Sequence, residues 1–497
     1  VAGTVKAVIS TDTDLTSLGD LEPVTTFEVD AGKTLSLAAS AANQFSVTGM
    51  GTLRVVGDAD ADLTAVTASL DVVEATGALT LPATVDADHS LRLMAEQADG
   101  LTLTGDGDVT VTALFSSADL SGIESSLRLT AEVVSGTLDV SDSEDWEGIL
   151  GQLDGFLVDT GATLRLSATE ADTTLINGEG TVYVSDLTAD TDLRSVDGAL
   201  WVVAEFTTGS PNISSWTNLG RVDAFNLSGD DTSLTLTASQ ASGVEITGSG
   251  TVNVTGLQDA TDLSDVAGGL DVTAKVTAGQ QIDVSGNANL STVDSYELEG
   301  GDEDTSLTLT AAQATGLDIT GTGSVAVTDL QSDTDLGGIV VTAVTAMVTS
   351  DITFTGDLGD AVVTVSDGKT LTLNASLADG AVIHGDEGAV AITHLEDSAS
   401  ADLSGIDAGT VTIDVSADAG AFVFEGDLGA VGHSVTIGAN TTLSLLAEQA
   451  SGREITGAGN LTVTGVTAST DLSGIGSEAA VPVSGFVGQF DTASWSV

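Results

Sequence analysis

One stretch of this chain occurs twice almost word for word, and this repetition restricts the possible folds more than any other feature. Ser306–Ile339 reads SLTLTAAQATGLDITGTGSVAVTDLQSDTDLGGI. Ser233–Val266 repeats it as SLTLTASQASGVEITGSGTVNVTGL and, after three residues, TDLSDV. Recurrence of this kind is the signature of repeat architectures, so the period must be settled before any fold is predicted.

An Asp-Leu pair preceded by Thr or Ala marks each copy. The marker aspartates are Asp14, Asp62, Asp119, Asp192, Asp262, Asp335, Asp402 and Asp471. Successive markers are 48, 57, 73, 70, 73, 67 and 69 residues apart, so the unit is about 70 residues long. The predicted divisions are a partial repeat at 1–18, seven repeats at 19–66, 67–123, 124–196, 197–266, 267–339, 340–406 and 407–475, and a remnant at 476–497.

The two ends of the chain fall out of phase with this unit. The first residues match the back half of a repeat, so the chain opens inside a unit, and the aromatic remnant at 476–497 is a candidate assembly contact. We expect solenoid ends of this kind to pair with another copy, because unpaired strand edges associate. Ser126-Leu-Arg-Leu is an extra, out-of-phase copy of the leading strand and indicates a partial duplication in the third repeat.

Apolar and small polar residues alternate within each unit, as in Leu307-Thr-Leu and Val325-Ala-Val. A period of two predicts strands with one buried face. Gly321-Thr-Gly323 lies between two such strands and predicts a sharp turn with positive φ. Ala311-Ala-Gln-Ala is the least strand-like segment, and we expect one helical turn or a bend there, packed against the neighbouring copy.

The strand spacing favours an all-β, repetitive β-solenoid of about seven units. Each coil of such a fold takes about 20–25 residues, so about three coils make one unit. The alternative is a string of small β-sandwich domains. Aromatic residues are only 3% of the chain and no Trp recurs in phase, which argues against sandwich cores.

The charge balance limits the partners. There are 74 Asp and Glu but only 11 Lys and Arg, for a net charge of −63. Binding of nucleic acid requires clustered cations, so nucleic acid is excluded as a partner. No apolar run is long enough to span a membrane. With no Cys, the chain has neither disulfides nor thiolate metal sites.

Acidic turns are the candidate metal sites, because Ca²⁺ takes hard oxygen ligands. The candidate ligands are Asp58, Asp60, Asp62, Asp86, Asp88, Asp302 and Asp304. A similar cluster, Asp142, Glu144 and Asp145, lies beside Trp146. The competing interpretation is that these residues cap turns and face water. No other cofactor is expected, and neither the EF-hand loop nor the tandem calcium-binding nonapeptide is present.

Catalytic patterns are absent from the sequence. The marker aspartate recurs in every unit, which favours a structural role such as an Asx turn at the same corner. There is no nucleophile elbow, and the four histidines form no metal-binding pattern. A carbohydrate-active β-helix enzyme would need one unit that departs from the others by a charged groove, and no such unit stands out. We therefore expect that the chain is not an enzyme.

The texture of the repeats, with LTLTAxQAxG and GxGxVxV motifs along the whole chain, resembles that of large secreted surface proteins of Gram-negative bacteria. These include adhesins of the RTX class and subunits of S-layers or extracellular filaments. The resemblance implies a place outside the cell or on its surface. It favours a self-assembling structural subunit, with the stalk of an adhesin as the alternative. The expected partners are other copies of the chain and cell-surface polysaccharide.

Overall fold

The computed structural model describes residues 5–18, 21–300 and 304–476. The chain is a β-solenoid of about 23 turns, and its strands stack in parallel. The described part of the chain runs from residue 5 to residue 476, so 23 turns correspond to about 21 residues per turn, within the predicted range. The solenoid prediction is therefore confirmed. The sandwich alternative is wrong, because sandwiches are built from antiparallel sheets.

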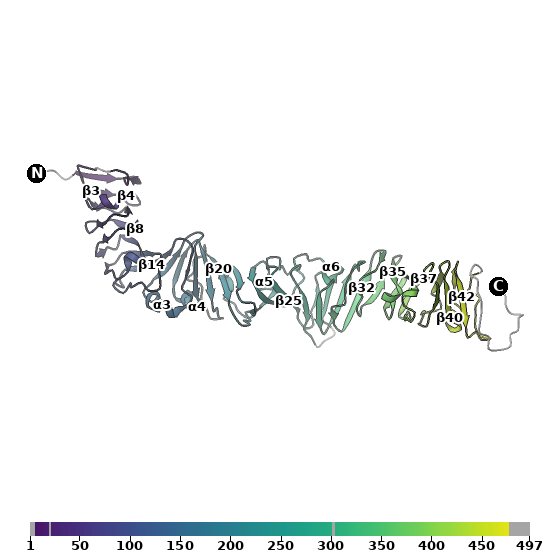
Figure 1. The fold of residues 1–497 in the computed structure, drawn as a ribbon. Helices are drawn as coiled ribbons and strands as arrows, with labels where there is room; N and C mark the ends of the chain where they lie inside the picture. Colours follow the sequence, from purple (N-terminus) through teal and green to yellow (C-terminus); the bar gives the residue numbers. More distant parts are fainter. Residues whose placement is uncertain (1–4, 19–20, 301–303, 477–497) are drawn as a thin grey trace. The chain divides into compact units, whose positions relative to one another are not determined.

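The chain divides into two compact units, residues 1–233 with 244–250, and residues 234–243 with 251–497. Figure 1 shows strands stacked coil upon coil within each of them. In the first unit, a three-stranded sheet has the spatial order β1 (Val5–Ile9), β3 (Val24–Val29), β5 (Ser46–Thr48), and two small sheets consist of β7 (Ala61–Asp62) with β9 (Leu79–Thr80) and of β10 (Thr84–Val85) with β12 (Thr104–Gly105). A nine-stranded sheet has the order β18 (Leu175–Gly178), β16 (Gly155–Val158), β14 (Arg128–Val133), β13 (Asp108–Thr112), β11 (Ser90–Met94), β8 (Ser69–Ala75), β6 (Thr52–Gly57), β4 (Thr34–Ala38), β2 (Thr13–Asp14). A six-stranded sheet has the order β15 (Thr137–Asp139), β17 (Thr163–Ser167), β19 (Thr181–Ser185), β20 (Trp201–Phe206), β21 (Ala224–Leu227), β23 (Glu245–Gly248).

The second unit is built in the same way. Its sheets are β22 (Ser233–Thr237), β24 (Gly250–Thr255), β25 (Leu270–Val276), β27 (Ser295–Leu298), β29 (Asp318–Gly321), β31 (Ile339–Val340); β26 (Gln281–Asp283), β28 (Ser306–Thr310), β30 (Ser324–Thr328), β32 (Ala343–Val348), β34 (Val362–Val365), β36 (Val382–Thr393), β37 (Ile406–Val415), β39 (Ser434–Ile437), β41 (Ile455–Gly457), with β33 (Ile352–Thr353) and β35 (Thr370–Asn374) beside this path; and β38 (Ala421–Val423), β40 (Thr442–Leu446), β42 (Asn460–Thr464).

Short helical turns interrupt the coils. They are α1 (Ala39–Ala42), α2 (Ala95–Ala98), α3 (Ser143–Leu150), α4 (Ala168–Thr173), α5 (Ala238–Ala241), α6 (Ala311–Ala314), α7 (Ala375–Ala378) and α8 (Ala447–Ala450), with the 3₁₀ turns η1 (Leu219–Arg221) and η2 (Leu395–Asp397). The helical turn predicted at Ala311 is confirmed as α6, and its Ala311 and Ala314 are buried.

Alternation along each strand builds the core. Leu307 and Leu309 on β28 are fully buried, while Thr308 and Thr310 between them are half-buried. In the next two coils, Leu307 pairs with Val325 and Val325 with Val344, so a column of aliphatic side chains runs from coil to coil. Burial of such columns is the main stabilising term of the fold.

One strand in each repeat joins that repeat to the next. One edge of β20, from Trp201 to Glu205, pairs with β19, which belongs to the predicted repeat 124–196. Its other edge, from Val203 to Phe206, pairs with β21, within 197–266. In the second unit, β25 likewise lies between β24 and β27. The larger sheets therefore contain strands of at least two successive repeats, and the repeats are not separate beads.

The helical turns also tie coils together. The side chain of Gln313 on α6 accepts a hydrogen bond from the Thr310 backbone N–H at 2.9 Å. Its Nε2 donates to the carbonyl oxygens of Val284 and Asn287, both at 2.8 Å, in the coil before. Gln97 on α2 bonds the carbonyls of Val72 and Ala75 in the same way. The Gln of the AxQA motif thus links its helical turn to backbone carbonyls of the coil before.

The predicted turn with positive φ is confirmed at Gly321, where φ is 115°. A Cβ atom there would lie 2.2 Å from the Leu298 carbonyl oxygen, so this corner requires glycine.

Candidate functional site

The acidic turns predicted to bind calcium do not converge. Asp58, Asp60 and Asp62 are exposed, and two of their carboxylates already accept backbone N–H groups, Asp60 from Ala78 at 2.8 Å and Asp62 from Thr64 at 3.0 Å. Asp86, Asp88 and Asp304 are exposed, and Asp302 lies outside the described residues. Within the described ranges no three Asp, Glu or His side chains are grouped to hold a metal ion. Calcium binding at these turns stays a prediction.

The marker aspartates all make the same turn. In each of the eight, Oδ1 accepts the backbone N–H of the residue two positions later, at 2.9–3.0 Å. The predicted Asx turn is therefore confirmed. Side-chain and backbone hydrogen bonds from that residue hold the pKa of seven of them below its ordinary value, and Arg194 lowers the pKa of Asp192 to about 2.

The corners are also linked from coil to coil. The backbone N–H of Asp119 donates to Oδ1 of Asp99, just after α2, at 2.7 Å, and the N–H of Asp402 donates to Oδ1 of Asp379 at 2.8 Å. Because the marker carboxylates form these turns, we assign a structural role to the marker aspartates.

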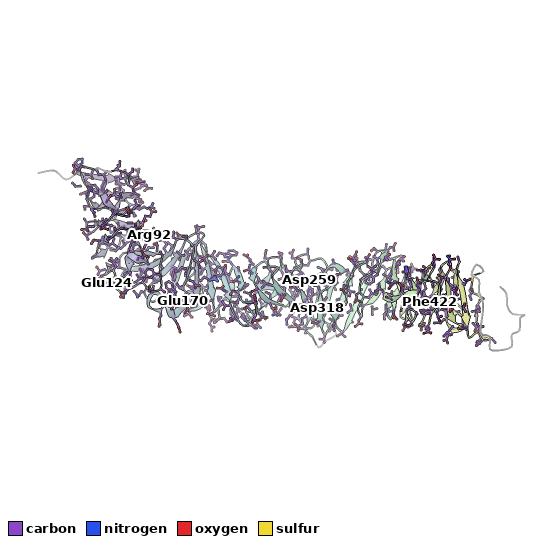
Figure 2. All side chains as sticks on the ribbon, viewed as in Figure 1. Arg92, Glu124, Glu170, Asp259, Asp318 and Phe422 are labelled. Atoms are coloured by element: carbon purple, nitrogen blue, oxygen red, sulfur yellow. The ribbon has the colours of Figure 1, made fainter. Side chains whose placement is uncertain are left out.

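A different group of charged residues lies on the outer face of the first unit. We call it the arginine cluster, and it consists of Arg54 on β6, Asp71 and Glu74 on β8, Arg92 on β11 and Glu132 on β14. Figure 2 labels Arg92. Its neighbours Leu91 and Leu93 point into the core, so alternation places Arg92 on the outside.

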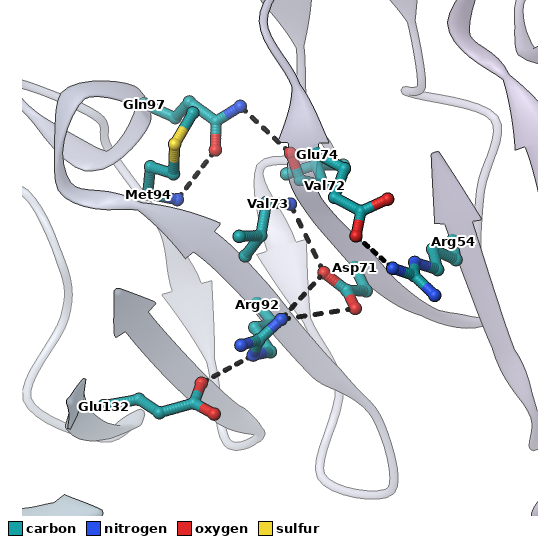
Figure 3. Close-up of polar contacts among 9 residues, drawn as sticks. All are labelled: Arg54, Asp71, Val72, Val73, Glu74, Arg92, Met94, Gln97 and Glu132. Atoms are coloured by element: carbon teal, nitrogen blue, oxygen red, sulfur yellow. Dashed lines mark hydrogen bonds and ion pairs between the residues drawn. The ribbon is translucent and has the colours of Figure 1, made fainter. Parts of the chain in front are cut away.

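The arginine cluster is held together by ion pairs across coils, as Figure 3 shows. Arg92 Nε donates to Glu132 Oε2 at 2.5 Å, and Nη1 lies 3.4 Å from both carboxylate oxygens of Asp71. Arg54 pairs with Glu74. Glu132 is only 9% exposed. Burial lowers the pKa of Arg92, but the hydrogen bonds and charges of Glu132 and Asp71 together outweigh it, and the pKa is raised.

An open hollow of about 520 Å³ lies over this cluster. Its lining joins charged groups to apolar ones, among them Met94, Leu114 and Val134. The Val134 side chain is 44% exposed. The site therefore offers fixed donors and acceptors next to an apolar wall, which is the usual composition of a small-molecule site.

The next repeat contains the same cross-coil pair. Arg165 on β17 binds Glu205 on β20, and in both cases the arginine precedes the glutamate by 40 residues. Here the guanidinium lies over the Tyr183 ring, 4.4 Å from its centre. A hollow also lies beside this pair, but its lining residues include no second arginine comparable to Arg54.

The arginine cluster was not predicted from the sequence, because so few cations in the chain made a charged groove look improbable. The signal was present in the repeats. Ser90-Leu-Arg-Leu and Thr163-Leu-Arg-Leu carry Arg where Ser306-Leu-Thr-Leu carries Thr. In both cases an Ala-Glu pair follows, with its Glu 40 residues after the Arg.

A buried polar group in the second unit organises one loop. Arg453 is 4% exposed and donates to the carbonyls of Ala430, His433 and Gly429 at 2.8, 3.0 and 2.9 Å. His433 Nδ1 contacts the Leu428 carbonyl oxygen at 2.9 Å. Burial lowers the pKa of His433. These contacts fix the loop before β39 in place.

No helix in the described ranges is long and apolar enough to cross a membrane. Comparison of the chain with protein-family models, with curated proteins and with solved structures gives no match.

Proposed function

We propose that this chain is a structural subunit of a bacterial extracellular filament, matrix or surface layer, without enzymatic activity, which self-assembles through the ends or sides of its repeats. The observation that carries the proposal is the sharing of sheets between repeats. Because β20 and β25 each belong to a sheet with strands of two repeats, the load on one repeat passes directly to the next.

The outer surface supports the same proposal. Eight of the eleven cations form ion pairs with Asp or Glu. Most carboxylates therefore remain on the surface without a cationic side chain, and two copies repel each other at low ionic strength. Side-by-side assembly then requires screening, and Ca²⁺ at the acidic turns is the candidate bridging ion.

The alternative proposal is the stalk of an adhesin, in which the same continuous stack carries a distant binding module. It differs in one respect that can be measured. A stalk stays monomeric at every ionic strength, whereas a layer or filament subunit associates once its charge is screened.

Sedimentation velocity combined with negative-stain electron microscopy tests this difference. We expect monomers at about 20 mM NaCl and ordered assemblies at about 500 mM NaCl. A second series compares about 5 mM CaCl₂ with NaCl of equal ionic strength, and a greater effect of calcium supports bridging. A chain that remains monomeric in both series, with intact termini, rules out self-assembly and leaves the stalk.

A further inference from the structure

We propose that the arginine cluster and the hollow above it bind a neutral oligosaccharide of two or three sugar units, as part of a neutral polysaccharide. This inference is independent of self-assembly, because a monomer would bind the sugar equally well. It rests on the arrangement of Arg54, Asp71, Glu74, Arg92 and Glu132 on the outer face of β6, β8, β11 and β14.

The charged side chains of the hollow are already positioned. Arg92 is held between Glu132 at 2.5 Å and Asp71 at 3.4 Å, and Arg54 is held by Glu74. Guanidinium groups only donate hydrogen bonds and carboxylates only accept them. A ligand that fits both must present donors and acceptors side by side, as the neighbouring hydroxyl groups of a sugar ring do. Little ordering is then needed on binding.

The apolar wall fits the other side of such a ligand. Val134 is 44% exposed at the rim, and Met94 and Leu114 also line the hollow. The C–H faces of a sugar ring can cover these side chains while its hydroxyls turn to the arginine cluster. The volume of about 520 Å³ is within the range of sites for ligands of this size.

Charge selects a neutral sugar. Within the cluster two arginines face three carboxylates, and the whole chain carries a net charge of −63. Long-range repulsion therefore disfavours a polyanionic glycan. A cationic ligand would approach easily, but in the hollow it would have to compete with Arg54 and Arg92 for carboxylates that already pair with them. A neutral ligand has neither penalty.

Isothermal titration calorimetry with full-length protein tests the inference, with maltotriose, cellotriose and mannotriose as neutral probes. Trigalacturonic acid is the anionic probe and the glucosamine trimer the cationic one. We expect at least one neutral trisaccharide to bind with a Kd of about 0.1–1 mM, and both charged trimers to bind at least about tenfold more weakly. Tighter binding of either charged trimer, or no binding of any neutral one at about 10 mM, overturns the proposal.

Two variants locate the site. Arg54→Ser removes an exposed pair, and Arg92→Thr with Glu132→Gln removes both charges of the central pair, with Thr as in Ser306-Leu-Thr-Leu. Each should weaken binding at least about tenfold. The matched control is Arg165→Thr with Glu205→Gln, which removes the equivalent pair of the next repeat and should leave Kd unchanged. Equal loss in this control, with all variants folded by circular dichroism, places the site elsewhere.

Discussion

Arg92 on β11 donates a hydrogen bond of 2.5 Å from Nε to Oε2 of Glu132 on β14. The bond crosses the intervening strand β13, although the two residues are 40 positions apart in the chain. The pair spans three adjacent strands of the sheet, of which β11 and β13 belong to the repeat 67–123 and β14 to the repeat 124–196. It therefore fixes the register of β14 relative to β11 from the outside, where the buried columns fix it from the inside.

The first prediction concerns this pair. Arg92→Thr alone leaves Glu132, 9% exposed, without its cation, and we expect a loss of about 2–4 kcal/mol in local stability. The double change Arg92→Thr with Glu132→Gln should cost about 1 kcal/mol, because no buried charge is left. Amide hydrogen exchange of β11, β13 and β14 measures both. Equal losses in the two variants would mean that the charge of Glu132 is solvated without Arg92.

The second prediction concerns the glutamine of the AxQA turn. Gln313→Leu removes the bonds of Nε2 to the Val284 and Asn287 carbonyls and the bond that Oε1 accepts from the Thr310 N–H, and should cost about 3 kcal/mol, at about 1 kcal/mol for each bond. The control is Gln281→Leu on β26, where the side chain is exposed. Hydrogen exchange of the segment around α6 distinguishes the two. Equal protection in both variants would show that water replaces Gln313 without loss.

The third prediction compares two glycines with positive φ in the same repeat. Gly321→Ala would place Cβ 2.2 Å from the Leu298 carbonyl oxygen, so the backbone of two coils must separate, and we expect a loss above about 3 kcal/mol. Gly316→Ala has a φ of 71° and no atom within 4 Å of its Cβ, and should cost only about 1–2 kcal/mol. Urea denaturation of the two proteins ranks them, and the reverse order would contradict the coil packing.

The fourth prediction concerns acid. The lowered pKa of Asp262 means that its carboxylate contributes stability above its ordinary pKa of 3.8, and that this contribution is lost as the pH falls through the lowered value. Asp262→Asn keeps an acceptor for the turn, as Asn212 does naturally by accepting the Ser214 N–H at 3.0 Å.

We therefore expect the stability advantage of the native chain over Asp262→Asn to shrink as the pH is lowered from about 6 to about 2.5. Comparison of the two proteins cancels the effect of acid on the total net charge. Denaturation midpoints at each pH measure the difference, and an advantage that stays constant over this range argues against the ionised Asx turn.

The fifth prediction concerns His433. Its pKa is lowered mainly by burial, with Arg453 adding to the effect, while the Leu428 and Ile406 carbonyls and Asp407 oppose it. Asp427 lies close enough to act on Arg453. The neutral imidazole is therefore favoured in the folded state, so stability is complete above the ordinary pKa of 6.5 and falls as the pH drops below it.

Hydrogen exchange of the loop from Leu428 to His433 should accelerate between about pH 7 and about pH 5 beyond the intrinsic change, and the loop before β35 serves as the internal reference. Equal behaviour of the two loops would mean that His433 is protonated without disturbing its contacts.

Several features of the fold could be predicted from the sequence because they depend on local residues. The alternation in Leu307-Thr-Leu determines which side chains of β28 face inward, the Ala-Gln-Ala segment predicts α6, and the marker aspartates predict their own turns. Each of these depends on residues within one strand or one corner.

Other expectations were wrong or incomplete. Ser126-Leu-Arg-Leu leads into β14, which lies next to β13 in the sheet as β20 lies next to β19, so it takes the position of β20 and not that of the leading strand β17. The acidic cluster at Asp142 begins a helix, α3, whose Trp146 and Ile149 are buried. Asp14 has the sequence of a marker, but its strand position differs from that of the other markers. It pairs in the sheet with Ser36, as Asp283 pairs with Thr308, so it corresponds to Asp283 and lies one coil away from the marker position.

The sequence by itself determined the period, the inward residues and the turns, because alternation, glycine and Asx chemistry act over a few neighbouring residues. Only the tertiary structure decided which strand lies beside which, and with it the joining of repeats through β20 and the assembly of the arginine cluster. That choice depends on hydrogen-bond register between segments about 20 to 40 residues apart, and many registers satisfy the same alternation.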